Sequence, residues 1–296
     1  MDKKAAAARE QAYQRSLKVH GIIRLIVCIL ITVISLFPIY IIVINATRSH
    51  EAVATQGVAF LPGGDLINNF NSLLTNEYVA ELFDPLKGYL NSLIIAGGST
   101  LLAVFFSGLT AYGLTVYDFK LKGAATIFVL AVMMIPTQVI SVGFMNFMAQ
   151  IGLLNNMIPL ILPSIASPAV VFFMLQYMKS SFPLEIVEAA RIDGCGEFRT
   201  FLQIGLPMLK PAFAVQAIFA FVASWNNYYT PSMLFVSPDA PKTMPMMVTA
   251  VVNSYNFNEF GAKYLAITLS VLPVIIVYLA LSKFIVKGVA LGAVKG

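Results

Sequence analysis

The chain has 296 residues, of which 58% are hydrophobic and only 11% charged, and its mean hydropathy is +0.81. Such a composition is far too apolar for a soluble domain and indicates a membrane protein. The net charge of +5 does not point to nucleic acid. The lysines and arginines flank apolar runs and form no patch with interleaved aromatic side chains, so the lipid bilayer is the simpler partner.

Six segments reach the length of about 20 predominantly apolar residues that a membrane-spanning helix needs. They are residues 22–44, 89–116, 124–148, 157–178, 209–230 and 264–286. The sequence therefore predicts an all-α membrane protein with six transmembrane helices. On this basis we divide the chain into an N-terminal segment (1–21), a six-span domain (22–286) and a C-terminal tail (287–296).

The distribution of lysine and arginine predicts the orientation, because these residues resist transfer across the membrane. Four short polar regions on one side of the predicted topology carry most of them: the N-terminus, the turn near residue 120, the loop of residues 180–210 and the tail. We expect this side to be the cytoplasm, with both termini on it. The predicted location is thus a bacterial cytoplasmic membrane, crossed several times.

The opposite side contains a long connection, residues 47–88, with a Leu61-Pro62-Gly63-Gly64 turn. Connections of this length usually have a function, so one interpretation is a folded cap or docking surface. The other is a loosely ordered loop, given its glycines and polar residues.

The polar loop of residues 180–210 carries the most informative pattern. Pro183 favours a helix start, and Gly194 can adopt the left-handed conformation that ends a helix, so a short helix is expected over 184–192. A second is expected over 197–206, stopped by Pro207. On the first helix, Ile186, Ala189 and Ala190 would form a small-residue face for another protein. Four charged residues would rim that face: Glu185, Glu188, Arg191 and Asp193.

This loop resembles the EAA loop of permease subunits in binding-protein-dependent ABC importers. The resemblance rests on a fixed spacing: Glu188, Ala189, Ala190, then Gly194, then Ile204, Leu206 and Pro207. Further words resemble the smaller, six-span permease related to the maltose transporter, and the similarity covers nearly the whole chain. These short motifs are Asn91-Ser92-Leu93, Ala111-Tyr112, Phe119-Lys120-Leu121-Lys122-Gly123, Gly152-Leu153-Leu154-Asn155, Trp225-Asn226 and the C-terminal Lys295-Gly296. Cys195 departs from the usual alanine.

The resemblance implies the type I ABC importer permease fold, with the loop acting as coupling helices that sit in a cleft of an ATPase subunit. The partners implied are a second related permease subunit, two cytosolic ABC ATPases and an external sugar-binding protein. The implied coupling residues are Glu188, Ala189, Ala190, Asp193, Gly194, Ile204, Leu206 and Pro207. The tail, with Lys295 and Gly296, would reach the ATPases; a disordered end is the competing interpretation. A locally folded loop without a partner is the alternative for the loop itself.

Catalysis by this chain is not expected. It has no G-x-x-x-x-G-K-[ST] phosphate loop, so ATP and Mg²⁺ would be bound by the partner ATPases. No metal site is predicted, because His20, His50, Cys28 and Cys195 lack ligand spacing. Other function classes remain: an ion-coupled secondary transporter, a non-transport scaffold or sensor, or an ABC permease for a non-sugar solute.

The expected substrate is a neutral sugar or oligosaccharide, since the spans contain almost no ionisable residue to pair with an ion. The candidate substrate pathway is a polar and aromatic cluster in the fifth span, Asn226, Asn227, Tyr228 and Tyr229, next to Ser224 and Trp225. Because Trp and Tyr also gather at membrane interfaces, an aromatic belt is the alternative interpretation of this cluster.

Overall fold

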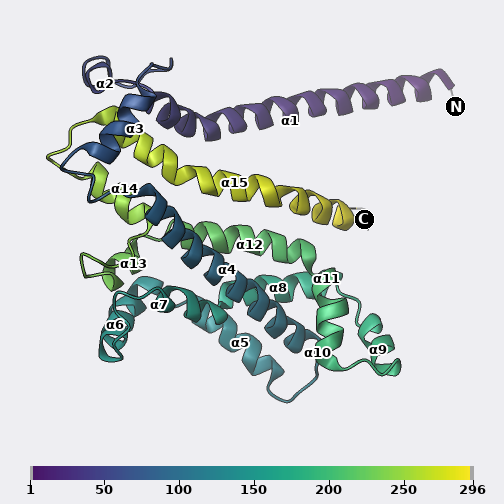
Figure 1. The fold of residues 1–296 in the computed structure, drawn as a ribbon. Coiled ribbons are helices and arrows are strands. Elements are labelled where there is room, and N and C mark those ends of the chain that lie inside the picture. Colours follow the sequence, from purple (N-terminus) through teal and green to yellow (C-terminus); the bar gives the residue numbers. More distant parts are fainter. Residues whose placement is uncertain (1–2, 294–296) are drawn as a thin grey trace. The chain divides into compact units, whose positions relative to one another are not determined.

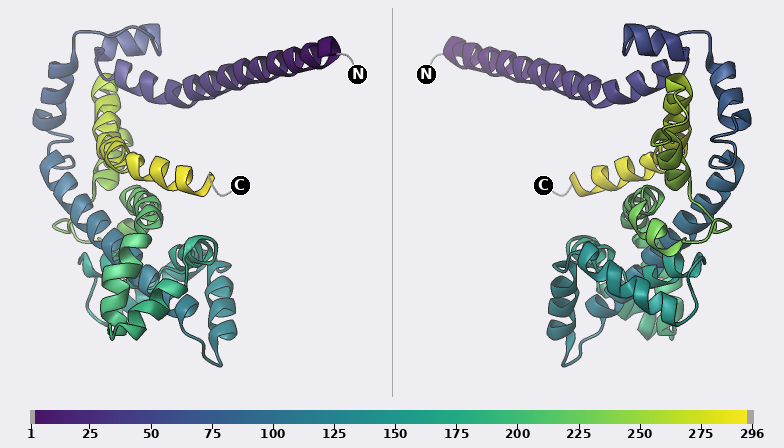
Figure 2. Two further views of the ribbon diagram at one scale, coloured as in Figure 1. Left: turned by 90° about the vertical axis from the view of Figure 1, so that its right-hand side faces the viewer. Right: turned by 90° about the vertical axis from the view of Figure 1, so that its left-hand side faces the viewer.

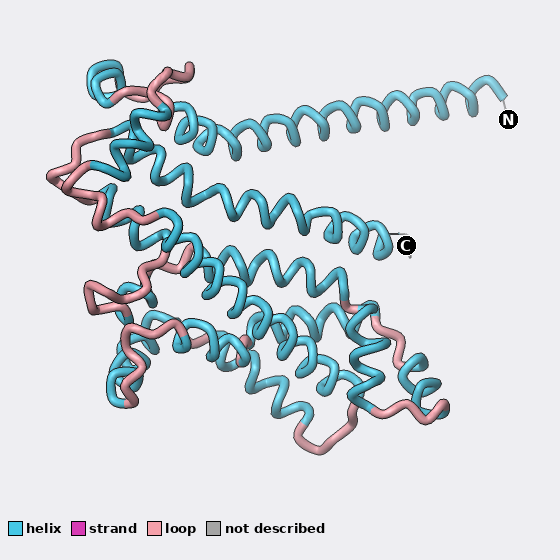
Figure 3. The backbone as a smooth tube through the Cα atoms, viewed as in Figure 1, coloured by secondary structure: helices cyan, strands magenta, loops and turns pink. Residues whose placement is uncertain are grey.

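The computed structural model of the chain describes residues 3–293, with side chains described within 13–282 except at positions 137 and 138. Within this part every regular element is helical and no strand occurs (Figure 3). The chain forms two units, residues 1–76 with 256–268, and residues 77–255 with 269–296.

The first unit contains three helices and the beginning of a fourth (Figure 1). These are α1 (Lys3–Asn45), α2 (His50–Gln56), α3 (Leu66–Thr75) and the first turns of α15 (Phe260–Ala293). α1 contains the expected first span and extends beyond it. Its most apolar stretch is not buried by the other helices of this unit. Lipid or another subunit must therefore cover it, since such a surface is not stable in water.

The connection after α1 is folded. The buried side-chain amide of Asn69 donates hydrogen bonds to the carbonyls of Ala46 (2.9 Å) and Arg48 (2.8 Å). The guanidinium of Arg48, also buried, donates to the carbonyl of Gly57 (3.2 Å). Because buried polar groups paired in this way specify one conformation, residues 47–76 are folded and the loosely ordered interpretation is wrong there. A cap or docking role of this segment stays a prediction.

The second unit is built around α4 (Pro85–Val116), which packs against α8 (Pro168–Ser181) and α12 (Lys210–Trp225). These helices, blue, teal and green, lie side by side in Figures 1 and 2. Small buried residues recur along α4 at helical spacing, which lets its neighbours approach closely. They are Ala96, Ser99, Ala103, Ser107 and Ala111.

Besides α4, α8, α12 and the later turns of α15, the second unit contains helices and turns of at most 14 residues. They are α5 (Lys122–Met133), α6 (Thr137–Gln150), α7 (Ile158–Ile161), the 3₁₀ turn η1 (Leu162–Ile165), α9 (Glu185–Ile192), α10 (Glu197–Thr200), the π turn η2 (Phe201–Gly205), α11 (Leu206–Met208), α13 (Tyr229–Leu234) and α14 (Met244–Val252).

The expected third span, residues 124–148, is not one helix. α5 ends at Met133 and α6 begins at Thr137, on either side of Pro136. Proline has no N–H to donate and disfavours helical backbone at the residue before it, so the helix is interrupted there. The prediction of a single continuous helix is wrong, although the segment is helical on both sides of the break.

The expected fifth span, residues 209–230, ends early, because α12 stops at Trp225 and a new helix, α13, begins at Tyr229. The side-chain oxygen of Asn227 accepts a hydrogen bond from the backbone N–H of Thr230 (3.2 Å). This contact satisfies one of the N–H groups that a helix start leaves unpaired. Asn227 thus lies between the two helices, and its side chain caps the start of α13.

Four helical stretches of the described residues are long and apolar enough to cross a membrane. They are Tyr13–Asn45, Pro85–Val116, Ile158–Ser181 and Phe260–Ser282. A fifth results if Glu197–Met208 and Lys210–Trp225, bent by 78°, are counted as one, and the third expected span contributes two shorter apolar helices. The all-helical membrane architecture is therefore confirmed, with the third and fifth spans interrupted and the fourth containing a 3₁₀ turn and two non-helical residues between α7 and α8.

Candidate functional site

The loop between α8 and α12 begins with α9, whose two ends follow from its sequence. Glu185 and Glu188 lie in its first turn, where carboxylates complement the helix dipole. At the other end Gly194 has φ +76°. The N–H of Cys195 bonds to the carbonyl of Ala190 (2.9 Å), and the N–H of Gly194 bonds to that of Arg191 (3.0 Å).

These two bonds are the Schellman arrangement, which needs a residue that tolerates positive φ. The predicted role of Gly194 as a helix terminator is therefore confirmed. The helix begins at Glu185, so Pro183 lies just before it and not in its first turn as expected.

The side of α9 that faces the rest of the chain differs from the expected one. Val187 is 1% and Ala190 6% exposed, and Val187 belongs to a cluster with Tyr112 and Phe201. In contrast, Ile186 and Ala189 are exposed. The prediction that Ile186, Ala189 and Ala190 form one face is wrong, because Ala190 points inward with Val187, three residues before it, one helical turn away.

The second part of the loop remains helical through the proline. α10, η2 and α11 run from Glu197 to Met208, and the N–H of Leu206 bonds to the carbonyl of Phe201, five residues earlier. Such a π turn changes the usual pairing and lets the helix continue past a residue without an N–H. The prediction that Pro207 stops the helix is wrong. The direction changes only after Met208, where the chain bends by 78°.

The residues of this second part divide between the interior and solvent. Gly205 is buried, Ile204 and Leu206 are half-buried, and Pro207 is exposed. A Cβ atom at position 205 would lie 3.1 Å from the ring of Tyr112 on α4. The glycine thus allows the loop to lie directly against the second span, a contact that no sequence pattern indicated.

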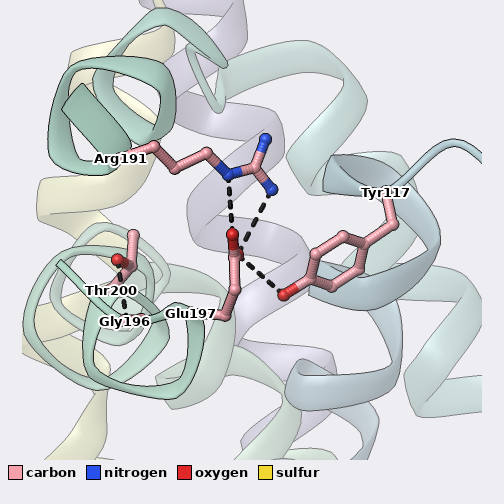
Figure 4. Close-up of polar contacts among 5 residues, drawn as sticks. All are labelled: Tyr117, Arg191, Gly196, Glu197 and Thr200. Carbon is pink, nitrogen blue, oxygen red and sulfur yellow. Dashed lines mark hydrogen bonds and ion pairs between the residues drawn. The ribbon is translucent and has the colours of Figure 1, made fainter. Parts of the chain in front are cut away.

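A polar contact joins the two halves of the loop to the end of α4 (Figure 4). Nε and Nη2 of Arg191 lie 2.7 Å and 3.2 Å from Oε1 and Oε2 of Glu197. The hydroxyl of Tyr117 donates to Oε2 of the same carboxylate (2.8 Å). Arg191 was expected to rim the outward face of α9, but its side chain turns to α10. Tyr117 is distant from Glu197 in the sequence, and the fold brings the two side chains together.

The electrostatic consequence is visible at both acids of this contact. Hydrogen bonds from Arg191, and then from Tyr117, lower the pKa of Glu197, because both donors favour the carboxylate form. Partial desolvation and then the hydrogen bond to Glu197 raise the pKa of Tyr117. The carboxylate is therefore ionised and the phenol protonated at neutral pH.

The loop also exposes large apolar side chains to solvent. Ile192 is 87% exposed, at the last position of α9. Others in the loop are Leu184, Ile186, Phe198 and Leu202. Because large exposed apolar side chains in an otherwise polar segment are a common feature of interaction surfaces, this loop is a candidate for one. Glu188, Ala189 and Asp193 are exposed in the same loop.

The expected substrate residues lie at the break between α12 and α13. Asn226 caps the end of α12, and Tyr228 and Tyr229 are exposed. The hydroxyl of Tyr229 accepts a hydrogen bond from Ser141 on α6 (3.4 Å). The structure brings these side chains to one irregular segment, in which Asn226, Tyr228 and Tyr229 are exposed and Asn227 is half-buried.

Trp225, in contrast, belongs to the protein interior. It is 1% exposed, its indole N–H donates to the carbonyl of Ser270 (3.0 Å), and its ring stacks with those of Tyr89 and Phe221. The aromatic-belt interpretation is wrong for this residue, because a belt tryptophan faces the lipid interface.

Asn155 fastens the turn after α6 to the segment after α13. Its backbone has φ +58°. Its side-chain oxygen accepts hydrogen bonds from the N–H groups of Val236 (2.8 Å) and Ser237 (2.9 Å). Asparagine is among the few residues that tolerate this conformation.

Two further motif residues, Asn91 and Ser92, fasten α4 to the segment before α14. The side-chain amide of Asn91 donates to the carbonyl of Lys242 (2.9 Å), and the hydroxyl of Ser92 accepts from the N–H of Met244 (2.8 Å). The motif residues Asn91, Ser92 and Asn155 thus all make structural contacts that the sequence alone did not predict.

Two other expectations concern the tail and metal binding. Lys295 and Gly296 lie outside the described residues. Among the described residues no group of three or more His, Cys, Asp and Glu side chains could hold a metal ion.

The chain is similar to known transport proteins. The family model of the binding-protein-dependent transport system inner membrane component matches residues 103–291. The arabinooligosaccharides transport system permease protein of Bacillus subtilis (strain 168) is 30% identical over 90% of this chain and 93% of its own length. The trehalose/maltose transport system permease protein of Thermococcus litoralis is 32% identical over 97% and 99%.

Among solved structures, a chain of a bacterial ABC transporter involved in the import of the acidic polysaccharide alginate has the same fold. The TM-score is 0.74 at 21% identity, over 91% of this chain and 97% of that one. The family match covers more than half of the present sequence and includes the loop of residues 180–210. This chain therefore belongs to the family of inner-membrane components of binding-protein-dependent transport systems.

Proposed function

We propose that this chain is a permease subunit of an ATP-driven ABC importer that moves a neutral sugar or oligosaccharide into the cytoplasm. It pairs with a related permease subunit, receives substrate from an external binding protein and is driven by two cytosolic ATPases, which bind the ATP and Mg²⁺. Both termini and the loop of residues 180–210 face the cytoplasm. The exposed apolar side of α9, opposite a side fixed to the spans, carries this proposal.

The two sides of α9 suit a part that passes on motion. Val187 and Ala190 attach it to its own chain, while Ala189 and Ile192 remain free for a partner. An eight-residue helix is not stable alone, so it moves together with whatever it packs against. ATP-driven closure of the ATPases would therefore displace α9 and, through it, the spans.

The roles assigned to the motif residues follow their positions. Glu188, Ala189 and Asp193 would contact the ATPase, and Gly194 would keep the end of α9 in shape. Ile204 and Leu206, both half-buried, would hold the second part of the loop against the spans, and Pro207 would stay with them.

A sugar substrate is supported by the relatives named for arabinooligosaccharides and for trehalose and maltose. It is supported also by composition: α4, α8, α12 and α15 contain no Asp or Glu. Ion-coupled transporters keep such groups within their spans. Asn226, Asn227, Tyr228 and Tyr229 offer the uncharged hydrogen-bonding groups and aromatic faces that bind sugars.

Reconstitution tests the transport mechanism. The permease pair, with its ATPases and binding protein, is placed in proteoliposomes, and uptake of labelled arabinooligosaccharide and maltose is measured with internal ATP or with an imposed proton or sodium gradient. We expect uptake with ATP alone. Uptake driven by the gradient without ATP would show a secondary transporter instead, and ATP-driven uptake of only a non-sugar solute would leave the importer but reject the sugar.

The docking surface has its own test. Replacing Ile192 by Asp should lower the amount of ATPase that co-purifies with the complex, since a carboxylate would be buried without a partner. Leu121→Asp is the control, because Leu121 is another strongly exposed apolar residue, on a different predicted cytoplasmic turn. Equal loss in both variants, or none in Ile192→Asp, would contradict docking on α9.

A further inference from the structure

The contact of Arg191, Glu197 and Tyr117 joins three separate elements. Arg191 belongs to α9, Glu197 is the first residue of α10, and Tyr117 directly follows α4. The guanidinium and the carboxylate form two hydrogen bonds, and the guanidinium carbon lies 5.7 Å from the centre of the Tyr117 ring. Figure 4 shows the guanidinium and the phenol converging on one carboxylate. Paired bonds of this kind fix orientation as well as distance.

Tyr117 is itself fixed at the end of the second span. The ammonium of Lys122, at the start of α5, donates to the carbonyls of Thr115 (3.3 Å) and Tyr117 (3.0 Å). The last carbonyls of a helix lack partners within it and attract a cation. The turn between α4 and α5 is therefore held by Lys122, and the Tyr117 side chain that contacts Glu197 extends from this fixed turn.

The apolar contacts of α9 do not fix its orientation as closely as the hydrogen bonds to Glu197 do. Val187 and Ala190 pack by hydrophobic contact, which is not directional. Between Gly194 and Glu197 the only connection along the chain is a short turn. The ion pair is half-exposed, and pairs in water contribute little to stability. We therefore expect the ion pair to fix the angles between α9, α10 and the end of α4, and to add little to the stability of the fold.

We propose that Arg191, Glu197 and Tyr117 form a positioning strut that holds the coupling loop at a fixed angle to the end of α4. When the ATPases displace α9, the strut passes the displacement to the second span, and without it the loop tilts and absorbs part of the motion. The inference rests on the proposed function, in which this loop is driven by ATPases.

The rival role for Arg191 is direct contact with the ATPase, as its sequence position suggested. The two roles differ in what else should matter. A strut requires the Tyr117 hydroxyl. It tolerates exchange of the two charges, because this hydroxyl can accept a hydrogen bond from an arginine at position 197 as well as donate one to a glutamate. A direct contact does not involve Tyr117, and it is lost when a glutamate replaces the arginine.

The first measurement follows the orientation of α9 in the permease pair before the ATPases are added, so that a label on the docking side does not compete with them. A spin label is placed at Ile192→Cys, in a background with Cys28→Ser and Cys195→Ser, because Ile192 is almost fully exposed. We expect greater label mobility in Tyr117→Phe and in Arg191→Gln. Tyr117→Phe retains the ring beneath the guanidinium and removes only the hydroxyl.

The second measurement is the ATP hydrolysed per solute imported in proteoliposomes. We expect this ratio to rise by about twofold to fivefold in Tyr117→Phe and Arg191→Gln, the range that matches loss of one exposed charged contact. The double variant Arg191→Glu with Glu197→Arg should return both the ratio and the label mobility toward wild type. A purely structural defect would not be rescued by exchanging charges.

Arg199→Gln is the matched control. Like Arg191→Gln, it removes one positive charge from the loop, in this case from α10. The Nε of Arg199 donates to Gln203 on the same helical run (3.1 Å) and not to α4. We expect wild-type label mobility in this variant. Unchanged mobility and ratio in Tyr117→Phe, or failure of the charge exchange to rescue, would overturn the strut.

The failure of this inference differs from a failure of the proposed function. If the wild-type complex showed no ATP-dependent uptake, the proposed function would be wrong, while the label would still report whether the three residues hold α9. If uptake is ATP-driven and Tyr117→Phe behaves as wild type in both measurements, only the strut is wrong.

Discussion

Gly108 on α4 lies against the ring of Phe213 on α12, so closely that a Cβ atom at position 108 would be 2.4 Å from Cζ of that ring. We therefore expect Gly108→Ala to force the two helices apart and to cost about 1–3 kcal/mol, as overpacking does. The melting temperature of the complex in detergent should fall.

Gly97, on the same helix, provides the control for Gly108, because a Cβ atom there would meet nothing within 4 Å. Alanine favours a helix more than glycine does, so Gly97→Ala should melt at or above the wild-type temperature. A Gly108→Ala variant as stable as Gly97→Ala would show that the two helices can separate freely.

The end of α9 depends on the backbone conformation of Gly194. A β-branched residue strongly disfavours φ +76°, so Gly194→Val should destabilise the Schellman end and misplace the exposed side of the helix. We expect uptake to fall relative to ATP hydrolysis while the amount of protein in the membrane is unchanged. Coupled uptake and hydrolysis in the variant would argue against a role for this turn.

Two variants separate conformation from volume at the α9 turn. Gly194→Asn should retain more uptake than Gly194→Val, because asparagine tolerates positive φ. Gly196→Val, two residues later, should behave nearly as wild type, since the φ of Gly196 is −69° and a Cβ atom would meet nothing there.

The start of α4 should show a pH dependence that comes from Asp84. Its carboxylate accepts a hydrogen bond from the N–H of Lys87 (3.0 Å), which lowers its pKa below the usual 3.8. A lowered pKa means that the folded state prefers the ionised form, so its contribution to stability is complete above pH 3.8. It is lost as the pH falls further, through the folded-state pKa.

The measurement for Asp84 is the melting temperature of wild type and Asp84→Asn between pH 6 and pH 2.5. Asparagine keeps a capping oxygen but does not titrate. We expect the advantage of wild type to shrink only below about pH 4. A constant difference across this range would mean that the carboxylate charge has no part in capping α4.

Asn155 should be sensitive in two separable ways. Asn155→Gly keeps the positive φ and loses the oxygen that accepts from Val236 and Ser237. Asn155→Ala also loses this oxygen, and its backbone must in addition adopt a positive φ that alanine disfavours. It should therefore be destabilised by about 1 kcal/mol more than the glycine variant. Thermal unfolding of the two variants and wild type gives the comparison, and equal stability of glycine and alanine would show that φ imposes no strain.

The features that follow local rules could be predicted from the sequence. The apolar runs identified the helical segments, and Pro183 with Gly194 identified α9 within about a residue at its start. These signals depend on composition and on the backbone preferences of single residues. The break at Pro136 depends on the same preferences, but in a membrane a proline can kink or interrupt a helix, and neighbouring contacts decide between the two outcomes.

Features that depend on tertiary contact could not be predicted. Ile186, Ala189 and Ala190 have helical spacing, yet an eight-residue helix with apolar residues on two sides does not reveal which side is its own interior. Trp225 has neighbours typical of an interfacial belt, and only its contact with Ser270 places it inside. Arg191 and Tyr117 are far apart along the chain, and a fold is needed to join them.

The π turn at Phe201–Gly205 has one residue more than an α-helical turn would hold at that place. Deleting a single residue there would rotate everything on its N-terminal side by about 100° around the helix axis. The outward side chains of α9 and α10 would then point in a new direction, although none of them had been changed. The length of this short segment thus belongs to the recognition surface as much as the side chains do.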